Sequence, residues 1–295
     1  MRFGVVAVLC GVLAASPAQA EAPQRVLSVG GAVTETVYAL GAGDRLVAVD
    51  STSLYPWEKT HVLPNVGYAR SLAAEGLLSM KADLMLAGPE AGPPAILDQA
   101  EKAGLRILRL HDGYTPEFAM ERIEEIGKAL DRRAEADALV KAMAEDIATV
   151  KAEVAAASSR PRVLFLLQAG RGAPMAGGAG SAADGMIALA GGVNAVTAFH
   201  GYKPLSPEAA VAAAPDILVM MKQSVDAIGG EDKVFALPEI AQTPAVRNRK
   251  LIVVDGLYSL GFGPRLAHAV HDLAVVFHPE RKFPALPERA WAKGQ

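Results

Sequence analysis

The stretch Arg25-Val26-Leu27-Ser28-Val29-Gly30-Gly31 has the composition of a short buried β-strand that ends at a glycine turn. A helical pattern follows at residues 34–40, and a second strand is expected at residues 46–49. The alternation continues with helices that the sequence predicts at residues 71–80 and 93–103, and strands at residues 83–87 and 105–110. Strands that alternate with helices favour a parallel sheet with helices on both faces, which is an α/β fold.

The second half of the sequence repeats this pattern. Arg162-Val163-Leu164 matches the beginning of the first strand. In addition, Glu75 precedes Asp83 by eight residues, just as Glu208 precedes Asp216, and both aspartates come directly before an apolar strand. Several matches in the same order indicate an internal repeat. We therefore expect two Rossmann-like α/β lobes with a ligand cleft between them.

Residues 117–157 connect the two halves and form one long helical pattern without proline. A single helix of this length would extend over ~60 Å. One interpretation is two packed helices with a turn near Asp131-Arg132-Arg133, and the other is one rigid helix that bridges the lobes. We favour the single helix, because the repeat restarts directly after it. The expected division is a signal peptide at residues 1–20, an N-terminal lobe at 21–115, a bridging helix at 116–158 and a C-terminal lobe at 159–295.

The first residues have the pattern of an export signal. Arg2 precedes an apolar run at residues 5–15, and Ser16-Pro17-Ala18-Gln19-Ala20 ends in a small-x-small motif. We expect cleavage after Ala20 and a periplasmic mature protein. Because Cys10 is the only cysteine and lies within the signal, the mature chain should contain neither a disulfide nor a thiolate metal ligand.

Composition excludes several classes of function. The net charge of −3 and the lack of a basic run do not favour nucleic-acid binding. The glycines at residues 177–180 lack the Lys-Ser/Thr ending of a phosphate-binding loop. No Gly-x-Ser-x-Gly motif or spaced carboxylate pair indicates a hydrolase. None of these patterns therefore supports nucleic-acid binding, nucleotide binding or hydrolysis.

The segment Gly67-Tyr68-Ala69-Arg70 places a phenol and a guanidinium two residues apart on an expected loop. Gly67 frees the backbone, and Ser71 is a candidate N-cap for the next helix. In an extended loop, Tyr68 and Arg70 would point the same way and could bind an anionic or metal-bearing ligand. The alternative is a tyrosine that packs on the loop beside a solvated arginine.

Several segments resemble the periplasmic haem-binding proteins of bacterial ABC haem importers. They are Val66-Gly67-Tyr68-Ala69-Arg70-Ser71-Leu72, Glu75-Gly76-Leu77-Leu78-Ser79, Pro174-Met175-Ala176-Gly177, Ala190-Gly191-Gly192-Val193-Asn194-Ala195 and Gly261-Phe262-Gly263-Pro264-Arg265. The resemblance extends over residues 25–277 and implies the helical-backbone substrate-binding fold. That fold also serves siderophore, cobalamin and zinc carriers, and the Gly-Tyr-x-Arg segment favours haem.

The resemblance implies a role for each matching residue. Tyr68 would be the axial ligand of ferric haem (protoporphyrin IX), and Arg70 would hydrogen-bond to its oxygen. A phenolate suits ferric iron, although a free phenol, with a pKa near ~10, needs a nearby cation to ionise at neutral pH. Glu75 and Glu208 would contact arginines of the membrane permease. The implied partners are an ABC permease with its ATPase and an outer-membrane haem receptor upstream, and the protein itself would be a monomer.

The second lobe offers a less defined set of haem contacts. Some relatives have a histidine in the segment at residues 168–175, but this chain has none there, so a second haem or histidine ligation is not expected. Candidates for the opposite wall of the cleft are Arg171, Met175, Tyr202, Lys203, Lys222 and Tyr258. The basic members could pair with haem propionates.

Alternatives from the sequence are a cobalamin or iron-siderophore carrier and a haem-dependent enzyme. The enzyme is disfavoured because no distal His–Arg pair has a recognisable spacing. His268 and His271 lie three residues apart on a predicted helix, but no acidic ligand pattern surrounds them, so we expect no metal site there. His200 is a weaker candidate for haem ligation than Tyr68.

Overall fold

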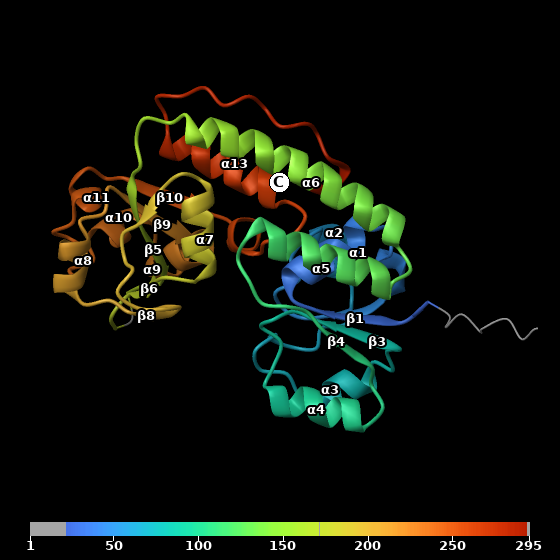
Figure 1. Cartoon of the computed structure of the whole chain (residues 1–295). Helices are drawn as coiled ribbons and strands as arrows, with labels where there is room; N and C mark the ends of the chain where they lie inside the picture. Colours follow the sequence, from blue (N-terminus) through green and yellow to red (C-terminus); the bar gives the residue numbers. More distant parts are fainter. Residues whose placement is uncertain (1–21, 171, 294–295) are drawn as a thin grey trace, which may run out of the picture.

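The computed structural model describes residues 22–170 and 172–293, and it has two α/β lobes as the sequence predicts (Figure 1). The expected signal peptide lies outside the described residues. In the described part of the chain, no helix combines the length and apolar character needed to cross a bilayer.

The N-terminal lobe has a parallel four-stranded sheet in the order β2-β1-β3-β4. Its strands are β1 (Val26–Val29), β2 (Leu46–Val49), β3 (Leu84–Ala87) and β4 (Ile107–Arg109). One face packs against α1 (Gly31–Ala39) and α5 (Pro116–Ala129), and the other packs against α3 (Ala74–Ser79) and α4 (Pro94–Lys102). The short elements η1 (Gly43–Arg45) and α2 (Trp57–Thr60) lie in the connections.

The C-terminal lobe has a mixed sheet in the order β10-β9-β5-β6-β8, with β7 paired to β5. Its strands are β5 (Arg162–Gln168), β6 (Met175–Gly177), β7 (Val193–Asn194), β8 (Tyr202–Pro204), β9 (Ile217–Met221) and β10 (Leu251–Val254). The strand β6 runs antiparallel to both β5 and β8. This lobe therefore adds an antiparallel edge that the N-terminal lobe does not have among its described strands.

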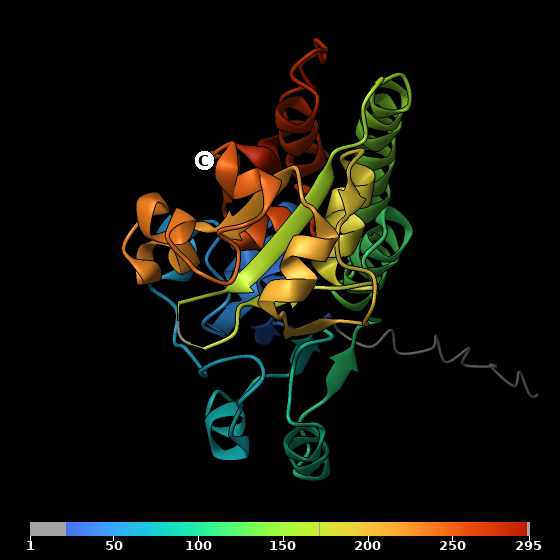
Figure 2. The ribbon, with the colours of Figure 1, turned by 90° about the vertical axis from the view of Figure 1, so that its left-hand side faces the viewer.

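Helices cover both faces of this second sheet, as Figure 2 shows on either side of β5. On one face are α7 (Ala182–Leu189), α12 (Gly256–Leu260) and α13 (Leu266–Phe277). On the other are α8 (Pro207–Ala213), α9 (Lys222–Ile228), α10 (Glu231–Phe235) and α11 (Pro244–Arg247). The short η2 (Ala290–Ala292) lies near the end of the chain.

The predicted repeat is confirmed at the level of single hydrogen bonds. A carboxylate oxygen of Asp83 accepts the backbone N–H of Arg25 at 2.9 Å, which ties the beginning of β1 to that of β3. In the other lobe, Asp216 accepts the N–H of Arg162 at 2.8 Å and ties β5 to β9 in the same way. The spacing of these aspartates in the sequence therefore reflects a shared structural role.

One long helix joins the lobes as expected, but its expected bounds of residues 116–158 are wrong. The helix α5 ends at Ala129, and α6 (Arg133–Ala155) begins after a turn in which Asp131 has a positive φ of 55°. The two helices pack closely, because a Cβ on Gly127 would lie 2.4 Å from that of Ala136. The helix α5 covers the N-terminal lobe, so α6 is the long helix that passes from one lobe to the other (Figure 1).

One apolar core extends through both lobes. It includes buried side chains from helices of the first lobe, the connection and the second lobe, such as Val37, Ile123, Ile147, Met186 and Val270. Separate clusters lie under α3 and α4 in the first lobe and under α8 to α11 in the second. Burial of apolar area is the main favourable term in folding, so this shared core couples the positions of the two lobes.

Candidate ligand-binding cleft

Tyr68 and Arg70 lie on a loop that backbone hydrogen bonds hold in place. Gly67 has a φ of 97°, which favours glycine, and its N–H donates to the side chain of Asn65 at 2.8 Å. Its carbonyl accepts the N–H of Ser51 at 2.9 Å. Tyr68 is 50% exposed although the loop is anchored. An exposed aromatic side chain on a fixed loop is suited to contact a ligand.

The residue after this motif does not cap the next helix. The prediction that Ser71 is an N-cap is wrong, because α3 begins at Ala74 and its N-cap is Ala73, which offers no side-chain cap. Instead, the N–H of Ser71 donates to the carbonyl of Tyr68 at 2.8 Å. The segment from Tyr68 to Ser71 is therefore a hydrogen-bonded turn and not the start of the helix.

Arg70 is exposed and faces both lobes. Its charge reaches Glu90 and Tyr114 of the first lobe and Tyr202 of the second. Burial raises the pKa of each of these three groups, and the charge of Arg70 opposes the shift in each. Among the described residues, Tyr68 and Arg70 form no side-chain hydrogen bond or ion pair, so both remain available to a ligand.

Glu90 lies at the carboxyl ends of β1 and β3, where ligands bind in open α/β sheets. Its carboxylate oxygens occupy space beside two glycines, since a Cβ on Gly30 or Gly88 would lie 2.6 or 2.9 Å from them. Glu90 was not predicted from the sequence, because a lone glutamate after a strand carries no motif. Glu90 is therefore a buried carboxyl group within reach of the charge of Arg70.

The opposite wall of the cleft contains Tyr202. It begins β8 and pairs with Gly177 of β6, and its ring packs edge-on against Phe165 with the centroids 6.3 Å apart. Met175 begins β6 and is half-buried. Lys203 is exposed, with its ammonium group 5.9 Å from the centre of the Phe199 ring. The antiparallel edge of the second sheet therefore carries three of the predicted residues.

The remaining predicted residues have other surroundings. Lys222 follows β9 as expected, but its ammonium donates to Asp226 at 2.7 Å. The Tyr258 hydroxyl donates to Asp272 at 2.8 Å. Arg171 lies outside the described residues. The rings of His268 and His271 contact the carbonyl oxygens of Pro287 and Pro284, so both hold the C-terminal segment.

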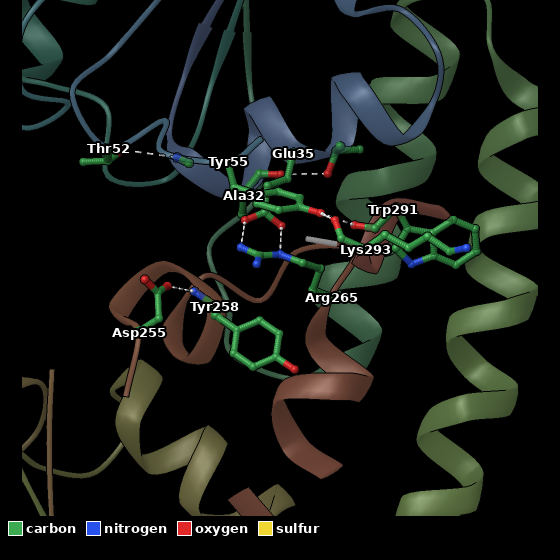
Figure 3. A network of polar contacts seen from close by, with 11 residues as sticks. Ala32, Glu35, Thr52, Tyr55, Asp255, Tyr258, Arg265, Trp291 and Lys293 are labelled. Atoms are coloured by element: carbon green, nitrogen blue, oxygen red, sulfur yellow. Dashed lines mark hydrogen bonds and ion pairs between the residues drawn. The ribbon is translucent and has the colours of Figure 1, made fainter. Parts of the chain in front are cut away.

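Arg265 joins the two lobes through a network of polar contacts (Figure 3). Its guanidinium donates to Glu35 of α1 from two nitrogens, and both side chains are about 5% exposed or less. The guanidinium lies 3.8 Å from the centre of the Tyr55 ring and 5.0 Å from that of Tyr258. Burial raises the pKa of the Glu35 carboxyl, and Arg265 opposes this shift.

Two further contacts hold the same junction. Arg122 of α5 donates to the carbonyl oxygen of Phe262 at 3.0 Å, across the two lobes. The Tyr55 hydroxyl donates to the carbonyl oxygen of Trp291 at 3.3 Å, so the end of the chain returns to the first lobe (Figure 3). Arg265 belongs to a segment that resembles the haem-binding family, but Glu35 and Arg122 lie within ordinary helical patterns and were not predicted from the sequence.

Residues 26–257 match the model of the periplasmic binding protein family. The chain belongs to this family. Among curated proteins, it is 27% identical over 262 residues to the uncharacterized ABC transporter substrate-binding lipoprotein YvrC of Bacillus subtilis (strain 168), a match that covers 88% of this chain and 81% of that protein. A shorter match is 41% identical to the vitamin B12-binding protein of Yersinia pestis (strain Pestoides F) and covers 34% of this chain and 35% of that protein.

Solved structures of haem-binding proteins share the fold over nearly their whole length. The periplasmic haem-binding protein RhuT from Roseiflexus sp. RS-1, in apo form, is 37% identical with a TM-score of 0.84, and the match covers 87% of this chain and 98% of that one. The haem-binding protein BhuT in complex with two haems is 38% identical with a TM-score of 0.83, covering 88% and 99%. This chain is therefore an extracytoplasmic substrate-binding protein of an ABC importer and not an enzyme. This role implies a membrane permease as its partner.

Proposed function

We propose that this binding protein takes up ferric haem in the cleft between its lobes and delivers it to the permease of an ABC importer. The observation that carries the proposal is the pair of exposed, unpartnered side chains of Tyr68 and Arg70 on an anchored loop. The similarity to RhuT and BhuT supports haem as the ligand.

In this proposal the phenolate oxygen of Tyr68 is the axial ligand of the ferric iron. Haem supplies the iron and the macrocycle, and tyrosine is a known axial haem ligand. Arg70 stabilises the phenolate by its charge and by hydrogen bonding. Because Arg70 also acts on Tyr202 across the cleft, the same cation contributes to both walls.

Residues of the second lobe complete the proposed haem site. Met175 and Tyr202 contact the opposite face of the macrocycle, and Tyr258 lies at the base of the cleft. Arg171 and Lys222 are proposed partners for the propionates. For Lys222 this requires an exchange of its bond to Asp226, which costs little because both side chains are more than half exposed.

The test replaces the proposed ligand while keeping its ring. Tyr68→Phe should lose the charge-transfer absorption of phenolate-bound ferric haem and weaken hemin binding by more than the ~10–100-fold typical of second-sphere changes. Arg70→Ala should keep the coordination and weaken binding within that range, more strongly as the pH falls. Hemin titration followed by absorption spectroscopy measures both effects.

His200→Ala is the matched control and should bind hemin as the wild type does. Retention of the wild-type spectrum by Tyr68→Phe, together with its loss in His200→Ala, would place the iron away from the first lobe. Cobalamin is the second candidate, because of the partial match to a vitamin B12-binding protein. Titration with cyanocobalamin in place of hemin separates the two ligands.

We also propose that Glu75 and Glu208 contact the permease. Both are exposed and lie in the first turns of α3 and α8, which occupy equivalent places in the repeat. Both helices lie away from α6, towards the outer ends of their lobes (Figure 1). One carboxylate on each lobe would let the permease contact both lobes at once.

A further inference from the structure

The C-terminal strap, residues 279–293, returns from the end of α13 to the first lobe and lies beside α6 (Figure 1). Within the described residues it has no helix or strand except the short η2. The half-buried side chains of Phe283, Leu286 and Trp291 pack against the apolar core that both lobes share. The family match ends at residue 257. The strap is therefore a packed part of the molecule that lies beyond the matched segment.

Two arginines fasten the strap along α6. Arg289 donates from two nitrogens to Asp146, at 2.9 and 2.7 Å, and Asp146 is only 3% exposed. Nearer the beginning of the strap, Arg281 donates to Glu153 at 2.6 Å. A buried carboxylate that loses its cation is strongly unfavourable, so the bond to Asp146 resists release. The order of these pairs shows that the strap runs antiparallel to α6.

The helix α13 holds the strap from its other side. The Nε2 atom of His271 lies 3.0 Å from the carbonyl oxygen of Pro284, and that of His268 lies 3.3 Å from the carbonyl oxygen of Pro287. Proline fixes its own φ and narrows the range of conformations open to the unfolded chain, so an extended segment with two prolines costs less entropy to hold. The strap is thus bound by both α6 and α13.

Tyr55 holds the end of the strap on the first lobe. Its hydroxyl lies 2.5 Å from the carbonyl oxygen of Lys293 and 3.3 Å from that of Trp291. Burial raises the pKa of this phenol, so the hydroxyl remains a neutral donor. The ring of Tyr55 lies against the guanidinium of Arg265 that pairs with Glu35, 3.8 Å from its centre (Figure 3). One side chain therefore contacts both the strap and the ion pair that joins the lobes.

We propose that the strap, acting through Tyr55, keeps Arg265 on Glu35 and so restricts the movement of one lobe relative to the other. The strap is bound to α13 of the second lobe, whereas Tyr55 belongs to the first, so the strap is a connection between the lobes in addition to α6. Tyr55 is a positioning residue that acts through Arg265 on the separation of the two cleft walls. The restraint itself is independent of any ligand, and its effect on hemin release rests on the proposed function.

The first measurement is the distance between the lobes in the protein without hemin. Because Cys10 is the only cysteine and lies in the expected signal peptide, Lys102→Cys on α4 and Ala212→Cys on α8 supply two exposed sites for spin labels. Pulsed electron paramagnetic resonance then gives the distribution of distances between them. Tyr55→Phe should broaden this distribution, because it removes only the hydroxyl that holds the strap. Deletion of the strap should broaden it further.

Tyr38→Phe is the matched control for Tyr55→Phe. Tyr38 is another half-buried tyrosine of the first lobe, and its hydroxyl has no hydrogen bond to another described residue. The distribution of distances in this variant should match that of the wild type. A distribution in Tyr55→Phe as narrow as that in Tyr38→Phe overturns the inference, and this comparison decides the matter even where the deletion variant does not fold.

The second measurement is the rate at which bound hemin passes to an excess of apomyoglobin. Tyr55→Phe should raise this rate by about two- to tenfold, the range for loss of one hydrogen bond, while the absorption spectrum of the bound hemin stays that of the wild type. Absence of Tyr68-dependent hemin binding in the wild type would contradict the proposed function and leave the interlobe distances readable. An unchanged rate in Tyr55→Phe, with hemin bound through Tyr68, would overturn the link between the strap and hemin release.

Discussion

The two lobes begin in the same way and build their cleft walls differently. In both, an aspartate accepts a backbone N–H at the beginning of the lobe's first strand: Asp83, before β3, from Arg25, and Asp216, before β9, from Arg162. The side chains of these arginines also donate to backbone carbonyls, Arg25 to Met80 and Arg162 to Ala213. The wall of the first lobe is then a loop between β2 and β3 that carries Tyr68. The wall of the second is an added antiparallel edge that carries Met175 and Tyr202.

This difference shows how a repeated fold acquires an asymmetric site. The parallel core of each lobe sets the position of the cleft, since ligands gather at the carboxyl ends of parallel strands. The residues that face the ligand come from segments outside the repeated core. The repeated parallel cores therefore set where the ligand site lies. The segments that differ between the two lobes supply the side chains that would contact the ligand.

The largest expected effect comes from breaking the junction that orients the lobes. Arg265→Ala leaves the buried Glu35 carboxyl without its cation and should lower the free energy of unfolding by about 3–5 kcal/mol. It should also permit a larger change in the radius of gyration on hemin binding than the nearly constant radius that we expect of the wild type. Urea unfolding and solution scattering measure the two effects.

Arg249→Ala is the control for the Arg265 variant. Arg249 pairs with Asp232 at the surface, where both side chains are more than half exposed, so its loss should cost no more than about 1 kcal/mol. Equal destabilisation by the two variants would show that the Glu35–Arg265 pair does not hold the lobes together.

A smaller loss of stability is expected when either aspartate that holds the first strand of its lobe, Asp83 or Asp216, is removed. Asp83 accepts two backbone N–H groups, from Gln24 and Arg25, whereas Asp216 accepts that of Arg162. Asp83→Ala and Asp216→Ala should each lower stability by about 1–2 kcal/mol, with Asp83→Ala the more costly, because a charged acceptor strengthens each bond. Chemical denaturation compares them, and a neutral result for both would contradict the shared role.

The smallest effect concerns the two docking helices. Ser206→Ala should cost about 1 kcal/mol because it removes the cap of α8. Ala73→Ser should add up to about 1 kcal/mol because α3 has no side-chain cap. Thermal unfolding measures both changes. If Ala73→Ser has no effect while Ser206→Ala destabilises, the exposed end of α3 does not accept a cap in this fold.

Much of the fold could be predicted from local sequence patterns. The strands expected at residues 25–29, 46–49 and 83–87 match β1, β2 and β3 closely, because short apolar runs bounded by glycine or aspartate mark buried parallel strands. The break between α5 and α6 could not be predicted from local sequence patterns. Asp131 adopts a positive φ without being glycine, so composition alone did not decide between one helix and two.

The candidate site was predictable to a similar extent. Tyr68 and Arg70 form a compact motif within four residues, and the structure leaves both exposed on one loop. Glu90 and the Glu35–Arg265 pair could not be found in the same way, because their partners lie far away in the sequence. Contacts of this kind depend on how the lobes pack and leave no local pattern.

By itself, the sequence determined the α/β class, the internal repeat and the loop with a tyrosine and an arginine, because each depends on residues close together in the chain. Only the tertiary structure decided which helix crosses between the lobes, where the end of the chain lies and which carboxyl groups become buried. Burial and ion pairing depend on groups brought together from distant segments. That is why the buried Glu35–Arg265 junction emerged only from the folded chain.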